Sequence, residues 1–164
     1  MTTILHKNFE YKIDKISLSE IPQIYQIELS CYPTPWTMDN FTAEIATSSG
    51  FNWCIKNDNN ILLGYLFSYI IFDEMFITNI CIHQNYHNQK IGSSLLKTIL
   101  SKAATASINK VFLEVREINH FAIKIYISNG FTIDCVKKNF YTNGDNAILM
   151  HKFLHNIHPD CHDI

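Results

Sequence analysis

The stretch from Lys110 to Phe131 is the strongest constraint on the fold, because it joins a strand pattern directly to a helix pattern. Lys110–Val115 reads K-V-F-L-E-V, an apolar run with one carboxylate, which is typical of a largely buried strand. Asn119–Asn129 then has the pattern of a helix, with Asn119 as a good N-cap and Gly130 as its natural C′ residue. A buried strand that leads at once into a helix indicates an α/β protein.

The remaining segments continue this mixture of strands and helices. Further strands are expected at 9–16, Trp53–Ile55, Ile61–Phe72, Glu74–Ile82, Val136–Phe140 and Ala147–Phe153. Further helices are expected from Ser19 as N-cap, from Thr37 or Asp39 to Ile45, and over Gly92–Thr105. The turn residues at 56–60 and the Asn143-Gly144 pair predict two antiparallel hairpins. The order β-α-α-β-β-β-α-β-α-β-β predicts a mixed central sheet flanked by helices.

Composition bounds the class of protein. The 164 residues, 47% apolar and 17% charged, fit one packed domain, expected over 1–154, with a flexible tail at 155–164. A formal net charge of −2 does not show the excess of positive charge that is typical of nucleic-acid-binding proteins. Neither a membrane-spanning run nor a signal-peptide pattern is apparent, and five scattered cysteines are typical of reduced thiols. We therefore expect a cytoplasmic protein, a monomer or weak dimer, without nucleic-acid or membrane partners.

The junction Ile80–Leu96, I-C-I-H-Q-N-Y-H-N-Q-K-I-G-S-S-L-L, predicts an anion site. A strand ends there, a polar loop follows, and a helix begins near Gly92. Free backbone N–H groups and the helix dipole favour negative charge at such a position. Lys90 and the hydroxyls of Ser93 and Ser94 could add contacts to a diphosphate. A single glycine before a helix more often only caps it, so this loop is weak evidence by itself.

Glu114, Asn119 and Tyr126 form a second chemical group. Asn119 and Tyr126 are seven residues apart, about two helical turns, so both side chains project from one face. A carboxylate, an amide and a phenol can then converge on one cleft, where one group removes a proton and another supplies one. Each residue also has a structural interpretation: Glu114 as an ion-pair partner, Asn119 as a helix cap, and Tyr126 as a core residue.

These features together resemble the GNAT family of N-acetyltransferases, and within it the RimI type, the ribosomal-protein-alanine N-acetyltransferases. The resemblance runs from about Tyr11 to Leu154. It rests on P-T-P-W-T at Pro33–Thr37, F-I-T-N-I-C-I-H at Phe76–His83, and L-E-V-R-E-I-N-H-F-A-I-K-I-Y-I-S-N-G-F at Leu113–Phe131. The family loop Q/R-x-x-G-x-G/A corresponds to His87–Gly92, where only the final glycine matches and Lys90 replaces the first.

The resemblance implies roles for individual residues. Acetyl-CoA would be the co-substrate, without a metal, and Glu114 would be the general base and Tyr126 the general acid. Trp36 and Tyr141 would contact the acceptor, a protein N-terminal α-amine such as the alanine of a small-subunit ribosomal protein. The residues implied to bind acetyl-CoA are Ile80, Cys81, Ile82, Asn88, Gln89, Lys90, Ile91, Gly92, Ser93 and Asn119.

Other functions stay open at this level. The acceptor could be a small amine, a lysine side chain or another N-terminus, or the chain could be a non-catalytic acyl-CoA-binding module. Trp36 could be an ordinary packing anchor, and Cys81 is more plausible as a strand filler than as a nucleophile. The tail carries a set of possible metal ligands, His151, His155, His158, Cys161 and His162. Their spacing matches no standard closed metal site, so a frayed terminus is the better interpretation.

Overall fold

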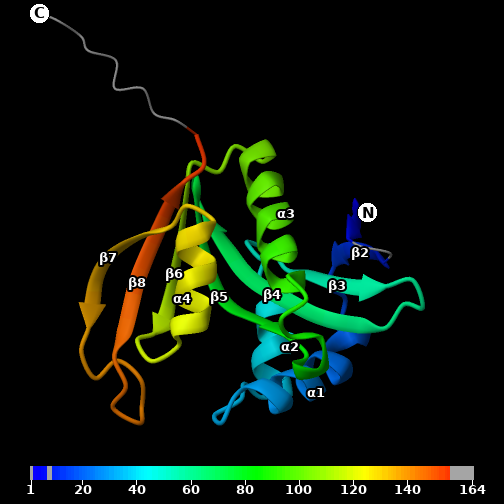
Figure 1. The fold of residues 1–164 in the computed structure, drawn as a ribbon, viewed down its shortest axis with the longest axis horizontal. Coiled ribbons are helices and arrows are strands. Elements are labelled where there is room, and N and C mark those ends of the chain that lie inside the picture. The colour runs from blue at the N-terminus through cyan, green and yellow to red at the C-terminus, as the bar shows by residue number, and fades with distance from the viewer. Residues whose placement is uncertain (1, 7–8, 156–164) are drawn as a thin grey trace, which may run out of the picture.

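The computed structural model describes residues 2–6 and 9–155, and these residues form one eight-stranded sheet with helices on both faces (Figure 1). The strands are β1 (Thr2–His6), β2 (Phe9–Lys15), β3 (Trp53–Asn57), β4 (Leu62–Ile71), β5 (Glu74–Ile82), β6 (Lys110–Arg116), β7 (Thr132–Lys137) and β8 (Ala147–Phe153). The helices are α1 (Ile21–Cys31), α2 (Met38–Ala46), α3 (Ile91–Thr105) and α4 (His120–Ser128), with short 3₁₀ turns η1 (Leu18–Glu20) and η2 (Gln84–Tyr86).

The predicted α/β class and mixed sheet are confirmed. The strand order is β1-β2-β3-β4-β5-β6-β8-β7, and only the β5–β6 pair is parallel. β1 is an additional edge strand that the sequence pattern did not indicate, and it pairs antiparallel with β2. The single domain over 1–154 stays a prediction, and the expected tail lies outside the described residues apart from His155.

Two local predictions were wrong. Ser17, and not Ser19, begins the first helical segment, because the Glu20 carboxylate accepts from the Ser17 N–H at 2.7 Å and completes a capping box. β7 runs over Thr132–Lys137 instead of Val136–Phe140, since Asn139 has a φ of 51° and cannot continue a strand. The Asn143-Gly144 turn therefore lies within a longer loop between Lys137 and Ala147.

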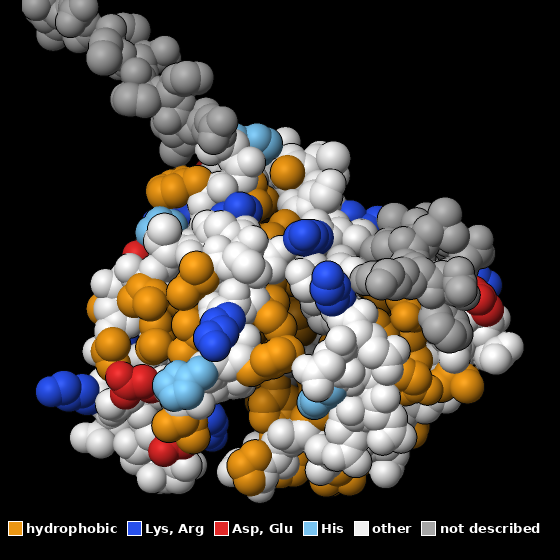
Figure 2. Space-filling model, viewed as in Figure 1, with side chains coloured by type: hydrophobic (Ala, Val, Ile, Leu, Met, Phe, Trp, Pro, Cys, Tyr) orange, Lys and Arg blue, Asp and Glu red, His pale blue; other side chains and the backbone are white. Residues whose placement is uncertain are grey.

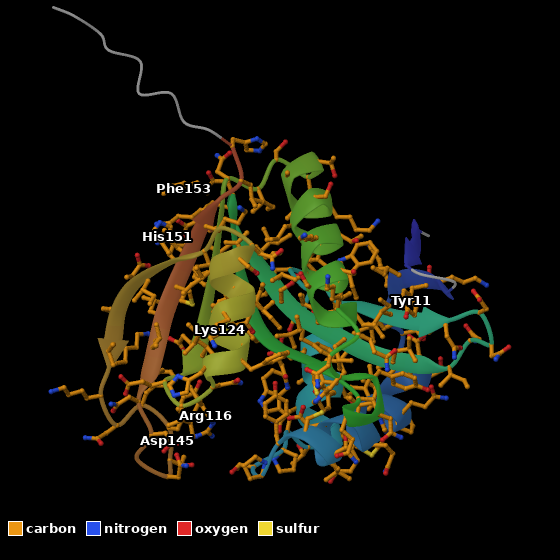
Figure 3. The ribbon with its side chains drawn as sticks, viewed as in Figure 1. Tyr11, Arg116, Lys124, Asp145, His151 and Phe153 are labelled. Carbon is orange, nitrogen blue, oxygen red and sulfur yellow. The ribbon has the colours of Figure 1, made fainter. Side chains whose placement is uncertain are left out.

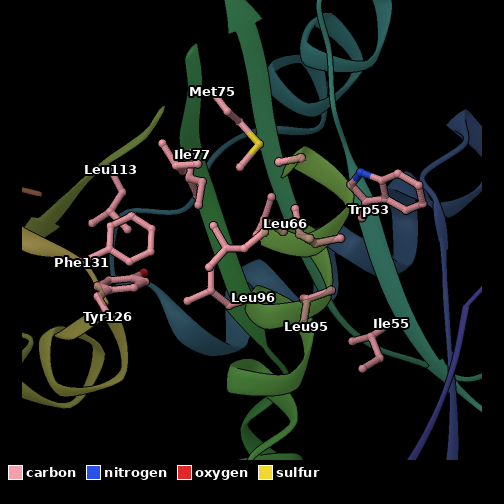
Figure 4. Close-up of a cluster of buried hydrophobic side chains, with 14 of the residues drawn as sticks. Trp53, Ile55, Leu66, Met75, Ile77, Leu95, Leu96, Leu113, Tyr126 and Phe131 are labelled. Atoms are coloured by element: carbon pink, nitrogen blue, oxygen red, sulfur yellow. The ribbon is translucent and has the colours of Figure 1, made fainter. Parts of the chain in front are cut away.

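Helices on the two faces bury separate apolar clusters. α3 presents the stripe Leu95, Leu96, Ile99, Leu100 and Ala103 to the sheet, as its spacing predicts, and every one of these residues is buried. Figure 4 shows this cluster extending from Trp53 past Leu66 and Leu96 to Tyr126 and Phe131. α1 and α2 pack on the opposite face against β4, through Phe41, Tyr65 and Phe67.

β5 and β6 separate part of the way along their length. Parallel pairing joins Glu74 through Ile77 to Lys110 through Leu113, and then it stops. On its other side β5 stays paired with β4, but Phe67 pairs with Asn79 and Ser68 with Ile77, so Thr78 is an extra, bulged residue. The second half of β5 consequently presents unpaired main chain toward β6.

A buried carboxylate fixes α1 and the loop after it to the sheet. The Glu28 side chain is 1% exposed. It accepts hydrogen bonds from the Trp36 N–H at 2.9 Å, from the Tyr65 hydroxyl, and from the Asn79 amide at 3.2 and 3.3 Å. These donors come from the loop, β4 and β5, so one side chain holds three segments together.

Removing this carboxylate should destabilise the fold strongly. Glu28→Ala leaves three donors, two of them buried, without an acceptor, and we expect a loss of about 2–5 kcal/mol in the free energy of unfolding, measured by urea denaturation. Gln26→Ala, on the exposed side of the same helix, should change it by less than about 0.5 kcal/mol. Similar losses in the two variants would show that Glu28 is not a structural anchor.

Candidate active site

Two cavities flank the point where β5 and β6 separate. The first, about 630 Å³, lies between the second half of β5, the start of α3 and one side of α4. Figure 2 shows the molecule hollowed between α3 and α4, with hydrophobic side chains inside the hollow. The second, about 560 Å³, is lined by side chains on the opposite face of β4, β5 and β6 and by the loop after β7.

The first cavity ends at the N-terminus of α3. The first intrahelical bond in this region runs from the Ser94 N–H to the Lys90 carbonyl, so the N–H groups of Ile91, Gly92 and Ser93 are free to bind a ligand. Lys90 and Lys97 also line this end. Free N–H groups, a helix dipole and two ammonium groups together suit a diphosphate.

Lys90, at the position of the first glycine in the pattern Q/R-x-x-G-x-G/A, has a left-handed backbone. It is the N-cap of α3 with φ 60° and ψ 9°, and Asn88 has a φ of 61°. Asparagine tolerates this region well, whereas lysine adopts it at a cost of about 1–2 kcal/mol. The loop therefore keeps a glycine-like path with a lysine in it.

Ile82, at the end of β5, lies between two glycines. A Cβ atom at Gly64 would come within 2.3 Å of the Ile82 Cδ1 and 2.5 Å of the Cys81 carbonyl oxygen. A Cβ atom at Gly92 would come within 3.3 Å of the Ile82 Cγ1. Gly64 and Gly92 thus let β4 and α3 approach the cavity wall closely. Gly64 itself lines neither cavity and acts through its contact with Ile82.

The open edge of β5 offers main-chain groups to the first cavity. Bonded pairs alternate along an antiparallel ladder, and the His83 N–H donates to the Leu63 carbonyl on β4, so Ile80 and Ile82 direct their main chain away from β4. The Tyr32 hydroxyl donates to the Ile80 carbonyl at 2.7 Å, and His87 Nε2 lies 2.7 Å from the Ile82 carbonyl. These carbonyls already have partners, so an extended ligand would first meet the N–H groups.

Two thiols meet beside the Ile82 carbonyl. Cys31 Sγ lies 3.3 Å and Cys81 Sγ 3.5 Å from this oxygen. Hydrogen bonding from Cys81, and further contacts with Ser30 and His87, lower the pKa of Cys31 to about 6 against the effect of burial. The same contact and burial raise the pKa of Cys81. Of the two thiols, Cys31 is therefore the one expected to ionise near neutral pH.

α4 supplies the amide and the phenol. The Asn119 Oδ1 caps the helix by accepting from the Ala122 N–H at 3.1 Å, which leaves its NH₂ group toward the cavity. Tyr126 is buried against Phe131, at a ring-centroid distance of 5.8 Å, and still lines the cavity. Burial raises the pKa of Tyr126, so the phenol keeps its proton at neutral pH.

Glu114 lies in the second cavity, on the other face of the sheet from Tyr126. Its Oε1 accepts from Lys137 Nζ at 2.5 Å, and its Oε2 has no partner among the described residues. Tyr141 lines the same cavity, 3.9 Å beneath the Arg116 guanidinium, and Arg116 also pairs with Asp145 at 2.6 Å. Figure 3 shows Arg116 and Asp145 close together below α4. This ion pair holds the loop between β7 and β8 over the cavity.

The predicted residues are divided between the two cavities. The expected acetyl-CoA residues all line the first cavity except Gln89, whose amide bonds to the Asn85 carbonyl at 3.4 Å. Trp36 lines neither cavity and packs on Phe41 and Phe67 at ring-centroid distances of 5.4 and 6.3 Å. Cys31 and Tyr32 belong to the loop Cys31–Thr37, which the sequence indicated as a wall of the acceptor channel, and the structure places both in the first cavity instead.

Two further observations concern the class of protein. Among residues 2–6 and 9–155, no cluster of three or more His, Cys, Asp or Glu side chains is arranged to hold a metal ion. His151, considered as a metal ligand, instead pairs with Asp134 at 2.5 Å. Within the same ranges, every helix is too short or too polar to cross a membrane.

Known proteins share both the sequence pattern and the fold. Residues 21–131 match the family model described as Acetyltransferase (GNAT) family. A Bacillus subtilis protein with the provisional name ribosomal protein bS18-alanine N-acetyltransferase is 31% identical over 84% of this chain and 92% of its own. The Escherichia coli K12 protein named ribosomal protein bS18-alanine N-acetyltransferase is 26% identical over 84% and 94%. The crystal structure of an Escherichia coli ribosomal-protein-S18-alanine N-acetyltransferase superposes with a TM-score of 0.85, at 24% identity, covering 93% and 99%.

The close approach at Gly92 should be needed for acetyl-CoA binding. A Cβ atom at position 92 would already crowd Ile82, and Gly92→Val adds two methyl groups beyond it. We expect at least a tenfold rise in the acetyl-CoA Kd, measured by calorimetry. Lys90→Gly should leave the acetyl-CoA Kd within about threefold of the wild-type value, because the backbone amides remain and glycine adopts the left-handed conformation of this position readily. An unchanged Kd in a folded Gly92→Val protein would contradict this binding mode.

The lowered pKa of Cys31 predicts an unusual reactivity profile. Its alkylation by iodoacetamide should reach half of its maximum rate near pH 6. An ordinary thiol, by contrast, is half ionised at about pH 8.5. Mass spectrometry should locate the adduct at Cys31, Cys31→Ser should lack it, and CoA should slow the reaction by filling the cavity. A rate at Cys31 that still rises steeply above about pH 8 would contradict the thiolate.

Proposed function

The chain belongs to the acetyltransferase (GNAT) family and is an acetyl-CoA-dependent N-acetyltransferase, and we propose that its acceptor is a protein N-terminal α-amine. The alanine of ribosomal protein bS18 is the first candidate, since relatives that span nearly the same length carry that name. We place the reaction in the cytoplasm, in keeping with the free thiols of Cys31, Cys54, Cys81 and Cys135.

The observation that carries this proposal is the pair of cavities at the separation of β5 and β6. Acetyl-CoA would enter from the α3–α4 face, with its diphosphate at the start of α3 and its pantetheine arm along Ile80–Ile82. The acceptor would enter the cavity that contains Glu114 and Tyr141. The thioester and the amine would then meet in the gap between the strands, where no main-chain pairing intervenes.

Glu114 would remove the proton of the amine. An α-amine has a reference pKa near 8, so a useful fraction is already neutral at about pH 7. When this nitrogen attacks the thioester carbon it gains a positive charge, and its N–H proton becomes acidic. The free Glu114 Oε2 could accept that proton through a water molecule. Lys137 would fix the orientation of the carboxylate through Oε1. An N–H group of the open β5 edge could stabilise the oxyanion.

Tyr126 would protonate the departing thiolate. As the tetrahedral intermediate collapses, the carbon–sulfur bond breaks and CoA leaves as a thiolate. Tyr126 lines the cofactor cavity and keeps its proton because burial raises its pKa. The reference pKa values of a phenol and a thiol are similar, and burial that raises the pKa of Tyr126 would also raise that of a CoA thiol in the same cavity, so proton transfer between them stays close to balanced. The reaction needs no covalent enzyme intermediate.

Substitutions at the two catalytic positions should separate their roles. Tyr126→Phe should lower kcat by about 10²–10⁴-fold and leave the acetyl-CoA Kd nearly unchanged. Glu114→Gln should lower the rate at about pH 7 and recover part of it as the pH rises, because more amine is then already neutral. The assay is CoA release with peptides that differ in their first residue.

Matched variants control for general disturbance. Tyr25→Phe on α1 and Glu117→Gln after β6 line neither cavity and should keep kcat within about twofold. Wild-type rates in both catalytic variants with an established peptide acceptor would overturn the proposed roles. An acetyl group found on Cys31 that transfers at the rate of turnover would instead show a ping-pong route.

A further inference from the structure

A row of rings crosses the sheet beside Glu114. Tyr69 on β4, Phe76 on β5, Phe112 on β6 and His151 on β8 are direct neighbours in register across four strands. Tyr69 and Phe76 are stacked at a centroid distance of 5.1 Å with planes 13° apart, and Phe76 and Phe112 at 5.1 Å with planes 10° apart. We call Tyr69, Phe76 and Phe112 the aromatic row.

The aromatic row is partly exposed, whereas the neighbouring part of the same sheet face is covered by a helix. On β4, Tyr65 and Phe67 point to this face and are buried under Phe41 of α2. Tyr69, two residues further along, is only partly buried, as are Phe76 and Phe112. All three line the second cavity together with Glu114. These rings therefore form a wall of the cavity into which the proposed acceptor enters.

The stacking determines which part of each ring meets a ligand. Side chains stand roughly perpendicular to a sheet, so rings stacked across neighbouring strands present their edges outward. Aromatic edges carry partial positive charge and aromatic faces partial negative charge. A ligand ring lying flat across the row would make edge-to-face contacts with it. An ammonium or guanidinium group would instead meet the positive edges and gain little.

The spacing along β6 indicates which acceptor residue would reach the row. Phe112 and Glu114 are two residues apart on the same face of the strand, which is about 6–7 Å. An extended peptide advances by the same distance over two residues. If the reacting amine lies at Glu114, the side chain of the third acceptor residue can lie over Phe112 and Phe76.

We propose that the aromatic row is a specificity subsite for an aromatic side chain at the third position of the acceptor. This inference rests on the proposed acceptor being a peptide N-terminus. The site would take Phe, Tyr or Trp in preference to aliphatic or cationic residues. It would thereby select among N-termini that share the same first residue.

Peptide affinity measured by calorimetry with CoA bound tests the subsite separately from turnover. Short peptides with N-terminal alanine would differ only at the third residue, as Phe, Leu, Arg or Ala. We expect the Phe peptide to bind the wild-type protein about tenfold more tightly than the Ala peptide, and the Arg peptide no more tightly than the Ala peptide. Failure to acetylate any peptide would overturn the proposed acceptor, while these affinities would still decide the subsite.

Variants of the row complete the test. Phe76→Leu and Phe112→Leu keep an apolar side chain but remove the ring edges, so the preference for the Phe peptide over the Ala peptide should fall to about threefold or less. Phe153→Leu is the matched control, because Phe153 lies on β8 at the end distant from Arg116 and Asp145 and does not line the cavity (Figure 3). Equal affinity of the wild type for Phe and Ala peptides, or a tenfold preference that persists in both row variants, would overturn the proposal.

Discussion

The interrupted pairing of β5 and β6 is the constraint on which the rest of the structure depends. Backbone N–H and C=O groups that leave a ladder must find other partners. After Ile77 and Leu113 the two strands no longer supply them to each other, and Thr78 is bulged on the opposite edge of β5. Tyr32 and His87 bind two of the exposed carbonyls. The remaining groups are available to a ligand, so the site follows from an unfinished sheet.

Packing around the gap keeps the two halves of the sheet apart without loosening them. Leu113 and Ile77, the last paired residues, lie in the same cluster as Leu96, Tyr126 and Phe131 (Figure 4). On the other face, Glu28 ties α1 and its following loop to β4 and β5. The gap is therefore bounded by rigid, buried contacts on both faces. A preorganised cleft of this kind positions reacting groups without a large conformational change.

Local pattern predicted the elements that carry the site, and tertiary pairing decided the rest. The spans of β5, α3 and α4 follow from apolar periodicity and capping residues, which are properties of neighbouring positions. Other features depend on partners far along the chain. They are the strand order, the separation of β5 from β6, and the pairing of β7 with β8 at residues other than those predicted. The lowered pKa of Cys31 depends first on Cys81, which is distant in sequence, and then on Ser30 and His87. Glu114 and Tyr126 could be chosen from sequence, but their placement on opposite faces could not.

This placement explains how one short stretch of chain could serve both ends of a reaction. Alternation along β6 directs Glu114 away from α4, while α4 crosses back over the other face and brings Tyr126 to the gap. In the proposed reaction the amine adds to the thioester carbon from the side of Glu114, and the thiolate expelled from the tetrahedral intermediate is protonated on the side of Tyr126. Each protonic group then contacts only the reactant on its own face. The strand-to-helix junction at Lys110–Phe131 thus places Glu114 and Tyr126, the proposed general base and general acid, in different cavities.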